Sequence, residues 1–185
     1  MVFGPRTQFG LYFLIFPDVL TAARIAALAH HCRREYGLRA EPLPTSRFHI
    51  SLQNLGAYDE MQTPENVAVK ARDAAANVKM SPFAVMFDRV ESFFGRKCHY
   101  PLVLRGDDGV VGLEILYRSL GVAMRRAGLK SRLDFAPHLT LLYDNRRIEK
   151  RFVEPIKWTV REFTLVLSLR GQTIYRPLGQ WQLSG

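Results

Sequence analysis

The order strand, helix, strand occurs twice along this chain of 185 residues. In each copy, a short apolar run typical of a buried strand precedes a longer segment with helical apolar spacing, and a second short apolar run follows. The first copy comprises residues 9–16, 18–36 and 48–55, and the second comprises residues 100–105, 108–128 and 137–143. The copies share little residue identity, so the repeat is topological. It predicts an α+β fold with two pseudo-symmetric lobes, each an antiparallel-rich sheet backed by helices, and a cleft between the sheets.

The remaining segments predict one more helix and three more strands. The helix runs from Pro64 to about Val78, and the strands cover residues 83–88, 158–169 and 173–183, the last two around Arg170-Gly171-Gln172. We expect Asp18 and Asp108 to cap the N-termini of their helices, and Gly37 and Gly128 to end them. No segment rich in Pro, Gly or Ser is long enough to be a linker, so residues 1–185 are expected to form a single bilobal domain.

The net charge of the chain favours an anionic partner. Lys and Arg total 26 against 17 Asp and Glu, which gives a formal charge of +9. This excess suits nucleic acid or a phosphorylated ligand, and solvated surface charge is the alternative. Cys32 and Cys98 form no disulfide framework, so we expect a reducing, cytoplasmic setting. The longest apolar run, residues 9–16, is too short to cross a bilayer, so no membrane association is expected.

Both copies end in the same four-residue pattern of His, apolar, hydroxyl, apolar. The pattern reads His49-Ile50-Ser51-Leu52 in the first copy and His138-Leu139-Thr140-Leu141 in the second. Because residues i and i+2 of a strand share a face, each imidazole should lie beside a hydroxyl, while the apolar residues face a helix. Half-buried structural histidines that donate to backbone carbonyls are the alternative interpretation. Two matches among only five histidines, at equivalent places in the repeat, favour a shared site.

Two imidazoles and two hydroxyls that face one cleft suit phosphodiester hydrolysis. A neutral His can accept a proton from water, and a protonated His can donate one to the leaving oxygen, because the reference pKa of about 6.5 is close to working pH. The hydroxyls of Ser51 and Thr140 could hold the phosphate oxygens as negative charge develops. This set of residues needs no metal and no cofactor.

On these motifs the chain resembles the 2H phosphoesterase superfamily, which is defined by two His-x-Thr/Ser-x motifs. The similarity is greatest to the RNA 2′,3′-cyclic phosphodiesterases, also named 2′-5′ RNA ligase-like proteins, and it extends to residues 11–18, 163–168 and 178–183. The resemblance implies a bilobal α+β fold and the opening of a 2′,3′-cyclic phosphate, usually to a 2′-phosphate, with reversible 2′-5′ ligation in some members. It also implies that His49 donates the proton and that His138 accepts it.

The chain departs from the family pattern at three positions. Ser51 replaces the commoner Thr, Phe16 precedes Pro17 where many relatives have Asp, and Tyr143 stands where many have Arg. On ideal strand alternation Tyr143 lies opposite His138, so it reaches the cleft only if the strand ends or bulges there. These departures leave the substrate open.

Further residues are weaker candidates for substrate contacts. Arg146 and Arg147 could hold an RNA backbone at the rim of the cleft, or could lie on a solvated loop. Tyr12 and Tyr143 could stack on a base, although core packing suits Tyr12 better. The expected partner is an RNA end or a nucleotide with a cyclic phosphate, with no obligate protein partner. A small cyclic or 2′-5′-linked nucleotide as substrate, or a non-catalytic RNA-binding module, are the alternatives.

Overall fold

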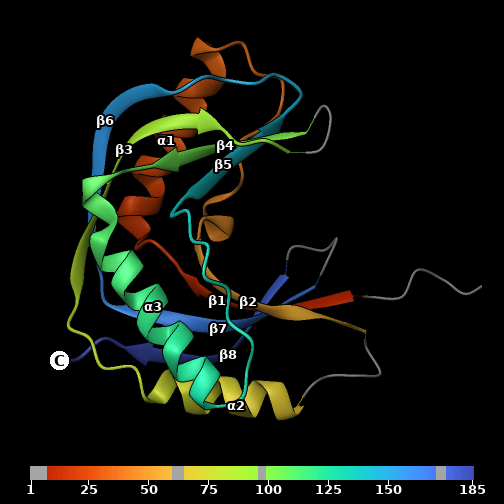
Figure 1. The fold of residues 1–185 in the computed structure, drawn as a ribbon. Coiled ribbons are helices and arrows are strands. Elements are labelled where there is room, and N and C mark those ends of the chain that lie inside the picture. Colours follow the sequence, from red (N-terminus) through yellow and green to blue (C-terminus); the bar gives the residue numbers. More distant parts are fainter. Residues whose placement is uncertain (1–7, 60–64, 96–98, 170–173) are drawn as a thin grey trace, which may run out of the picture.

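The computed structural model describes residues 8–59, 65–95, 99–169 and 174–185, with an α+β architecture (Figure 1). The helices of these ranges are α1 (Val19–Glu35), α2 (Glu65–Ala76) and α3 (Val111–Arg126). The strands are β1 (Gln8–Ile15), β2 (Ile50–Asp59), β3 (Phe83–Ser92), β4 (Tyr100–Arg105), β5 (Leu139–Asp144), β6 (Arg151–Val160), β7 (Glu162–Leu169) and β8 (Ile174–Gln182). None of these helices has the length and apolarity needed to span a bilayer.

The strands form two four-stranded antiparallel halves that meet at one residue pair. The order across the sheet is β6-β3-β4-β5-β2-β1-β7-β8, so the two predicted copies, β1-α1-β2 and β4-α3-β5, contribute the four central strands. The halves are connected between β2 and β5 at a single paired position, Ile50 opposite Leu139. The predicted fold of two pseudo-symmetric sheets is therefore confirmed, and a local twofold axis relates the halves about this pair.

Helix α1 packs across the molecule, on the half that its own copy does not form, whereas helix α3 contacts both halves. Helix α1 follows β1 but contacts β5 and β6, while α3 follows β4 and contacts β2 as well as β3 (Figure 1). Helix α2 packs on α3 and β8. The chain therefore crosses from one half to the other before each motif, and the segments 36–49 and 127–138 carry out these crossings.

Most of the predicted helix ends are confirmed. The Asp18 carboxylate accepts hydrogen bonds from the backbone N–H and the hydroxyl of Thr21, each at 2.8 Å, which caps α1. Gly37 and Gly128 follow α1 and α3 with φ of 60° and 75°, a conformation that glycine adopts without a Cβ penalty. The predicted cap at Asp108 is wrong, because a 3₁₀ turn over Asp108–Val110 precedes α3 and no side chain caps that helix.

The predicted strand over residues 158–169 is wrong, because two strands occupy this region. β6 ends at Val160 and β7 begins at Glu162. Pro155 lies inside β6, and proline is tolerated there because β6 is an edge strand. Burial alternates only in the second half of β6, so the sequence pattern of its first half does not indicate a strand. The turn predicted at 170–172 lies outside the described residues.

Candidate active site

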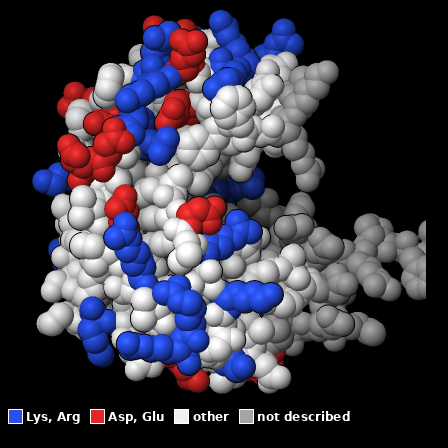
Figure 2. All heavy atoms as spheres, in the orientation of Figure 1, with Lys and Arg blue, Asp and Glu red and all other residues white. Residues whose placement is uncertain are grey.

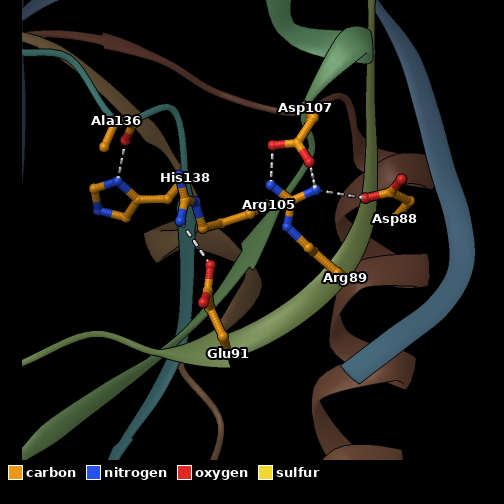
Figure 3. A network of polar contacts seen from close by, with 7 residues as sticks. All are labelled: Asp88, Arg89, Glu91, Arg105, Asp107, Ala136 and His138. Carbon is orange, nitrogen blue, oxygen red and sulfur yellow. Dashed lines mark hydrogen bonds and ion pairs between the residues drawn. The ribbon is translucent and has the colours of Figure 1, made fainter. Parts of the chain in front are cut away.

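His49 and His138 occupy equivalent places at the junction of the two halves. Each residue directly precedes a member of the Ile50–Leu139 pair. The Nδ1 atom of His49 lies 2.7 Å from the carbonyl oxygen of Arg47, and Nδ1 of His138 lies 2.7 Å from that of Ala136 (Figure 3). A carbonyl can only accept, so Nδ1 carries the proton in both rings and Nε2 is the nitrogen left for acid–base work.

The hydroxyls lie on the same side of their strands as the histidines. Burial alternates along both motifs: Ile50, Leu52, Leu139 and Leu141 are buried, Ser51 is exposed, and His49, His138 and Thr140 are half-buried. The apolar residues therefore face the core and the polar residues face away from it. The structure thus brings each predicted imidazole to the same face as its predicted hydroxyl. Between the two halves the molecular surface is hollowed (Figure 2).

A β-bulge occurs at the fourth residue of both motifs. In the pairing of β1 with β2, Leu52 is the extra residue between the Phe13–Gln53 and Leu14–Ser51 pairs. In the pairing of β4 with β5, Leu141 is the extra residue between the Leu102–Leu142 and Val103–Thr140 pairs. The bulge reverses the alternation of faces beyond this point.

Tyr143 reaches the side of the histidines because of the bulge in β5. Leu141 and Leu142 are both buried, and the next residue, Tyr143, is 39% exposed. Its ring stacks on His99, with centroids 4.8 Å apart and planes at 7°. Strand alternation without a bulge would have placed Tyr143 on the opposite face. The bulge that its approach to the cleft requires is therefore present in β5.

Aromatic rings pack beside both imidazoles. The rings of Phe16 and Tyr175 lie 6.4 Å and 5.4 Å from that of His49, measured between centroids. The hydroxyl oxygen of Tyr175 lies 3.4 Å from Nδ1 of His49. The Phe93 ring lies 4.8 Å from that of His138. These contacts remove water from both rings, and this burial is the largest cause of the lowered pKa of His49 and of His138.

Charges in the site also lower both pKa values. The positive charge of Arg105 lowers the pKa of His138, and the charges of His138 and Arg47 lower that of His49. The hydrogen bonds from Nδ1 to the backbone carbonyls oppose these effects in both residues. Each histidine therefore favours its neutral form, and the two imidazoles are close enough to influence each other's protonation.

Two polar side chains form hydrogen bonds to the segments that precede the histidines. Each side chain lies on one motif strand and bonds the segment before the other motif, an arrangement that we call crosswise bracing. Asp144, at the end of β5, accepts backbone hydrogen bonds from Arg39 and Ala40, each at 2.8 Å, in the segment that leads to His49. Gln53, in β2, bonds both the N–H (3.1 Å) and the carbonyl (3.4 Å) of Arg132, in the segment that leads to His138. Each motif strand therefore fixes the approach to the other motif.

The weaker candidates have contacts of their own. Tyr12 is half-buried on β1, and its ring lies over Gly10. The Arg146 guanidinium donates to the carbonyl of Tyr36 at 2.9 Å, which ties it to the end of α1. The Arg147 guanidinium lies 4.0 Å from the centroid of the Phe94 ring, which is 83% exposed. Neither arginine is placed against the imidazoles by these contacts.

Sequence reasoning did not single out Arg105, Phe93 or Tyr175 as site residues. All three reach the histidines from strands or a hairpin distant in the chain, and no local pattern marks them. Arg105 alone left a signal, since it follows a predicted strand and precedes Gly106, but strand-end arginines are commonly solvated. Among the described residues, no group of three or more His, Cys, Asp or Glu side chains could hold a metal ion.

The comparisons with known proteins concern the family and the fold. The family model of the 2′-5′ RNA ligase superfamily matches residues 17–172. The apo structure of E. coli LigT aligns with 25% identity and a TM-score of 0.70, covering 98% of this chain and 100% of that one. The same E. coli protein in complex with 3′-AMP aligns with 25% identity and a TM-score of 0.67, covering 96% and 99%. TT0787 of Thermus thermophilus, at 22% identity and a TM-score of 0.67 over 95% and 98%, shares the fold.

No match to this chain is found among curated proteins. The fold and the two His-x-hydroxyl motifs nevertheless define a 2H phosphoesterase. With most of its length matched by the family model, the chain belongs to the 2′-5′ RNA ligase superfamily.

Proposed function

We propose that this protein opens 2′,3′-cyclic phosphate ends of RNA by hydrolysis to a 2′-phosphate, without a metal ion. The family and fold support phosphodiesterase-type activity. The observation that carries the finer proposal is the pair of imidazoles, each with Nδ1 held by a carbonyl at 2.7 Å and Nε2 unencumbered by that bond. Each half contributes one imidazole and one hydroxyl, so the catalytic unit is residues 1–185 as one bilobal domain.

The proposed reaction uses one histidine as base and the other as acid. Nε2 of neutral His138 takes a proton from water while the water oxygen attacks phosphorus. The bond between phosphorus and the 3′ oxygen breaks, and Nε2–H of protonated His49 gives its proton to that oxygen. The hydroxyls of Ser51 and Thr140 donate to the non-bridging oxygens, whose negative charge increases in the transition state.

The charge beside His138 supports its role as the base. The positive charge of Arg105 lowers the pKa of His138, which keeps that ring neutral and able to accept a proton. The equivalent strand position beside His49 is occupied by Phe16, and the positive charge of Arg47 lowers the pKa of His49 as well. An anionic phosphate bound between the rings favours the protonated form of His49, since an opposite charge nearby raises a histidine pKa.

A small cyclic or 2′-5′-linked nucleotide is the second candidate substrate. E. coli LigT, 25% identical, has been crystallised with 3′-AMP, which shows that this relative accepts a mononucleotide. Because hydrolysis and its reverse share one transition state, reversible 2′-5′ ligation would use the same two imidazoles with their roles exchanged. A non-catalytic RNA-binding module is the third candidate.

The deciding experiment is product analysis with 2′,3′-cyclic nucleotides and with cyclic-ended oligonucleotides, in the presence and absence of EDTA. We expect a 2′-phosphomonoester as product and equal rates with and without the chelator. Loss of hydrolysis in EDTA that one divalent ion restores would contradict the His-based mechanism. A bound oligonucleotide that is never cleaved would favour the binding module.

Salt dependence separates the two substrate classes. RNA that contacts several phosphate-binding side chains gives a steep dependence of log(kcat/KM) on log[salt], whereas a mononucleotide gives a shallow one. We expect the steeper slope for the oligonucleotide.

A reducing, cytoplasmic setting, proposed from the cysteine usage, stays a prediction.

A further inference from the structure

Arg105 stands next to His138 in the sheet. Leu104 of β4 pairs with Leu139 of β5, which places the following residue, Arg105, beside His138. The Phe93 ring touches both neighbours: its centroid lies 4.8 Å from that of the His138 ring and 5.1 Å from Cζ of Arg105. The guanidinium therefore lies at the edge of the site that holds the imidazoles (Figure 3).

The hydrogen-bonding capacity of Arg105 is only partly used. One terminal nitrogen, Nη1, donates to Glu91 at 2.6 Å, and both side chains keep about a quarter of their surface exposed. Its Nε–H is buried and has no hydrogen-bond partner in the described part of the chain. An unpartnered buried donor is unfavourable, so an anion that engages this guanidinium gains both charge and hydrogen bonds.

Arg89, which pairs with Arg105 across β3 and β4, is different. It is only 4% exposed, and it is bonded by the carboxylates of Asp107 and Asp88 (Figure 3). Two carboxylates balance its charge, and its role is to join β3 to the start of the α3 segment. The Nε–H of Arg89 is also buried without a partner among the described residues, but the charge of Arg89 is already balanced. Within the described ranges Arg105 has one carboxylate partner, Glu91, and it adjoins His138, so its charge is available to a ligand.

The position equivalent to Arg105 in the other half does not hold an arginine. Ile15 pairs with Ile50 as Leu104 pairs with Leu139, so Phe16 occupies the place beside His49 that Arg105 occupies beside His138. The strand neighbour of His138 is therefore a cation and that of His49 is an aromatic ring. The arginine whose charge acts on His49 is Arg47, which belongs to the segment before the motif and not to a paired strand.

We propose that Arg105 is the phosphate-binding cation of this cleft, and that Glu91 holds it in position and partly neutralises it until an anionic substrate displaces the carboxylate. The inference rests on the proposed function for the identity of the substrate, but the binding of phosphate itself can be measured without turnover. It assigns Arg105 two effects: attraction of the phosphate, and preference for neutral His138.

The test compares the native protein with four variants and uses inorganic phosphate as the probe. Calorimetry measures phosphate binding, and NMR spectra record the ring resonances of His138 and His49. Arg105→Gln removes the charge, Arg105→Lys keeps it without the planar fork, and Glu91→Gln frees the arginine. Arg118→Gln is the matched control, because Arg118 lies on α3 with an 80% exposed side chain that pairs with Glu114.

We expect Arg105→Gln to weaken phosphate binding by about ten- to a hundredfold, as is usual for a lost hydrogen bond between charged groups. Arg105→Lys should fall between this variant and the native protein. Glu91→Gln should tighten phosphate binding by about three- to tenfold, since it removes a competing carboxylate. Arg118→Gln should bind as the native protein does.

The pKa of His138 gives a second readout. If the ion pair of Arg105 and Glu91 were purely structural, the two variants would not shift this pKa in opposite directions. The charged or titratable groups placed around this ring are Arg105 on β4, Glu91 on β3 and His49. We expect the pKa of His138 to rise in Arg105→Gln and to fall in Glu91→Gln, with smaller changes at His49.

Native phosphate affinity in Arg105→Gln would overturn the inference, as would equal weakening by Arg105→Gln and Glu91→Gln, which would mark the pair as structural. Should Arg105→Gln fail to fold, Arg105→Lys and Glu91→Gln still decide, because opposite shifts in phosphate affinity are required of them. A protein that binds phosphate through Arg105 but opens no cyclic phosphate would refute the proposed function and leave this inference standing.

Discussion

At the scale of single residues, two backbone carbonyls determine what the imidazoles can do. The carbonyl oxygens of Arg47 and Ala136 hold Nδ1 of His49 and His138 at the same distance, 2.7 Å. Each carbonyl belongs to the residue two positions before its histidine, so the arrangement is local to each motif. It fixes the ring orientation and leaves Nε2 as the group that exchanges protons.

Replacement of either histidine should abolish most of the activity. We expect His49→Ala and His138→Ala each to lower kcat by about 10²–10⁴-fold, the usual contribution of a positioned acid or base. Initial rates at saturating cyclic nucleotide measure the effect, and circular dichroism checks that the fold is kept. Near-native turnover in either variant would remove that histidine from the mechanism.

The hydroxyls should matter less than the imidazoles. Thr140→Val keeps the side-chain shape and deletes only the donor, so we expect a loss of about ten- to a hundredfold in kcat, less than for a fully enclosed oxyanion donor. Ser51→Ala should behave similarly, and Ser51→Thr should retain activity because the hydroxyl remains. Equal activity of Thr140→Val and the native protein would contradict a role in holding the phosphate.

The pH profile should have its maximum on the acidic side. Burial and neighbouring positive charge lower the pKa of both histidines from the usual 6.5. A mechanism that needs one neutral and one protonated imidazole is fastest midway between the two apparent pKa values of the pair. We therefore expect a bell-shaped profile of kcat/KM with its optimum below pH 6.5. A plateau from pH 5 to 9 would count against the two-histidine mechanism.

At the scale of elements, the crosswise packing links the two motifs. Helix α1 packs on the half that contains β5, and α3 contacts β2 of the opposite half as well as β3 of its own. The bracing by Asp144 and Gln53 follows the same crossing, since each side chain binds the segment that leads to the opposite motif. A substitution in one motif strand should therefore change the surroundings of the histidine in the other motif.

This coupling can be tested with two near-isosteric variants. Asp144→Asn replaces an acceptor oxygen of the carboxylate by an N–H₂ group, and Gln53→Glu places an oxygen against the carbonyl of Arg132. We expect Asp144→Asn to shift the NMR ring signals of His49 more than those of His138, and Gln53→Glu to do the reverse. Both should lower kcat more than they raise KM. Larger shifts at the histidine of the mutated strand would contradict crosswise bracing.

The sequence predicted elements best where a local rule operates. Asp18 caps α1, and Gly37 ends it in a left-handed conformation, because both depend on neighbouring residues alone. The first half of β6 was missed because its polar residues and Pro155 indicate no strand until a neighbouring strand pairs with them. The bulges at Leu52 and Leu141 depend on the register with β1 and β4, which no local pattern reveals.

At the scale of the whole molecule, the twofold repeat was the most informative signal. Two equivalent histidines imply two equivalent strands, and the central pair Ile50–Leu139 confirms that these strands meet. Arg105 and Tyr175 could not be predicted, since they approach the histidines only when distant strands assemble. The sequence therefore predicts the two repeated His-x-hydroxyl motifs. It does not predict the residues, such as Arg105 and Tyr175, that make the surroundings of the two histidines different.

The stability of the fold should decline in two stages on acidification. His49 and His138 have lowered pKa values in the folded protein, so the unfolded chain takes up protons first as the pH falls below 6.5. Hydrogen bonds hold the pKa of Asp18 and of Asp144 below the usual 3.8, so their stabilisation is lost only as the pH falls further, from 3.8 toward their folded values.

Urea unfolding followed at a series of pH values measures both stages. The matched control is a protein with both histidines replaced by Ala, in which the free energy of unfolding should lose the decline that begins near pH 6.5 and keep the later one. A native protein with constant stability from pH 7 to pH 5 would show that the two imidazoles titrate as they do in the unfolded chain.

The twofold axis through the Ile50–Leu139 pair has a stereochemical consequence. A cyclic phosphate on that axis has two prochiral non-bridging oxygens, and a perfectly symmetric site would present the same surroundings to both. Here Ser51 stands opposite Thr140, and Phe16 corresponds to Arg105. Sulfur substituted for one oxygen or for the other therefore meets different neighbours, and these departures from symmetry add to the difference with which the protein binds the two phosphorothioate diastereomers of a cyclic substrate.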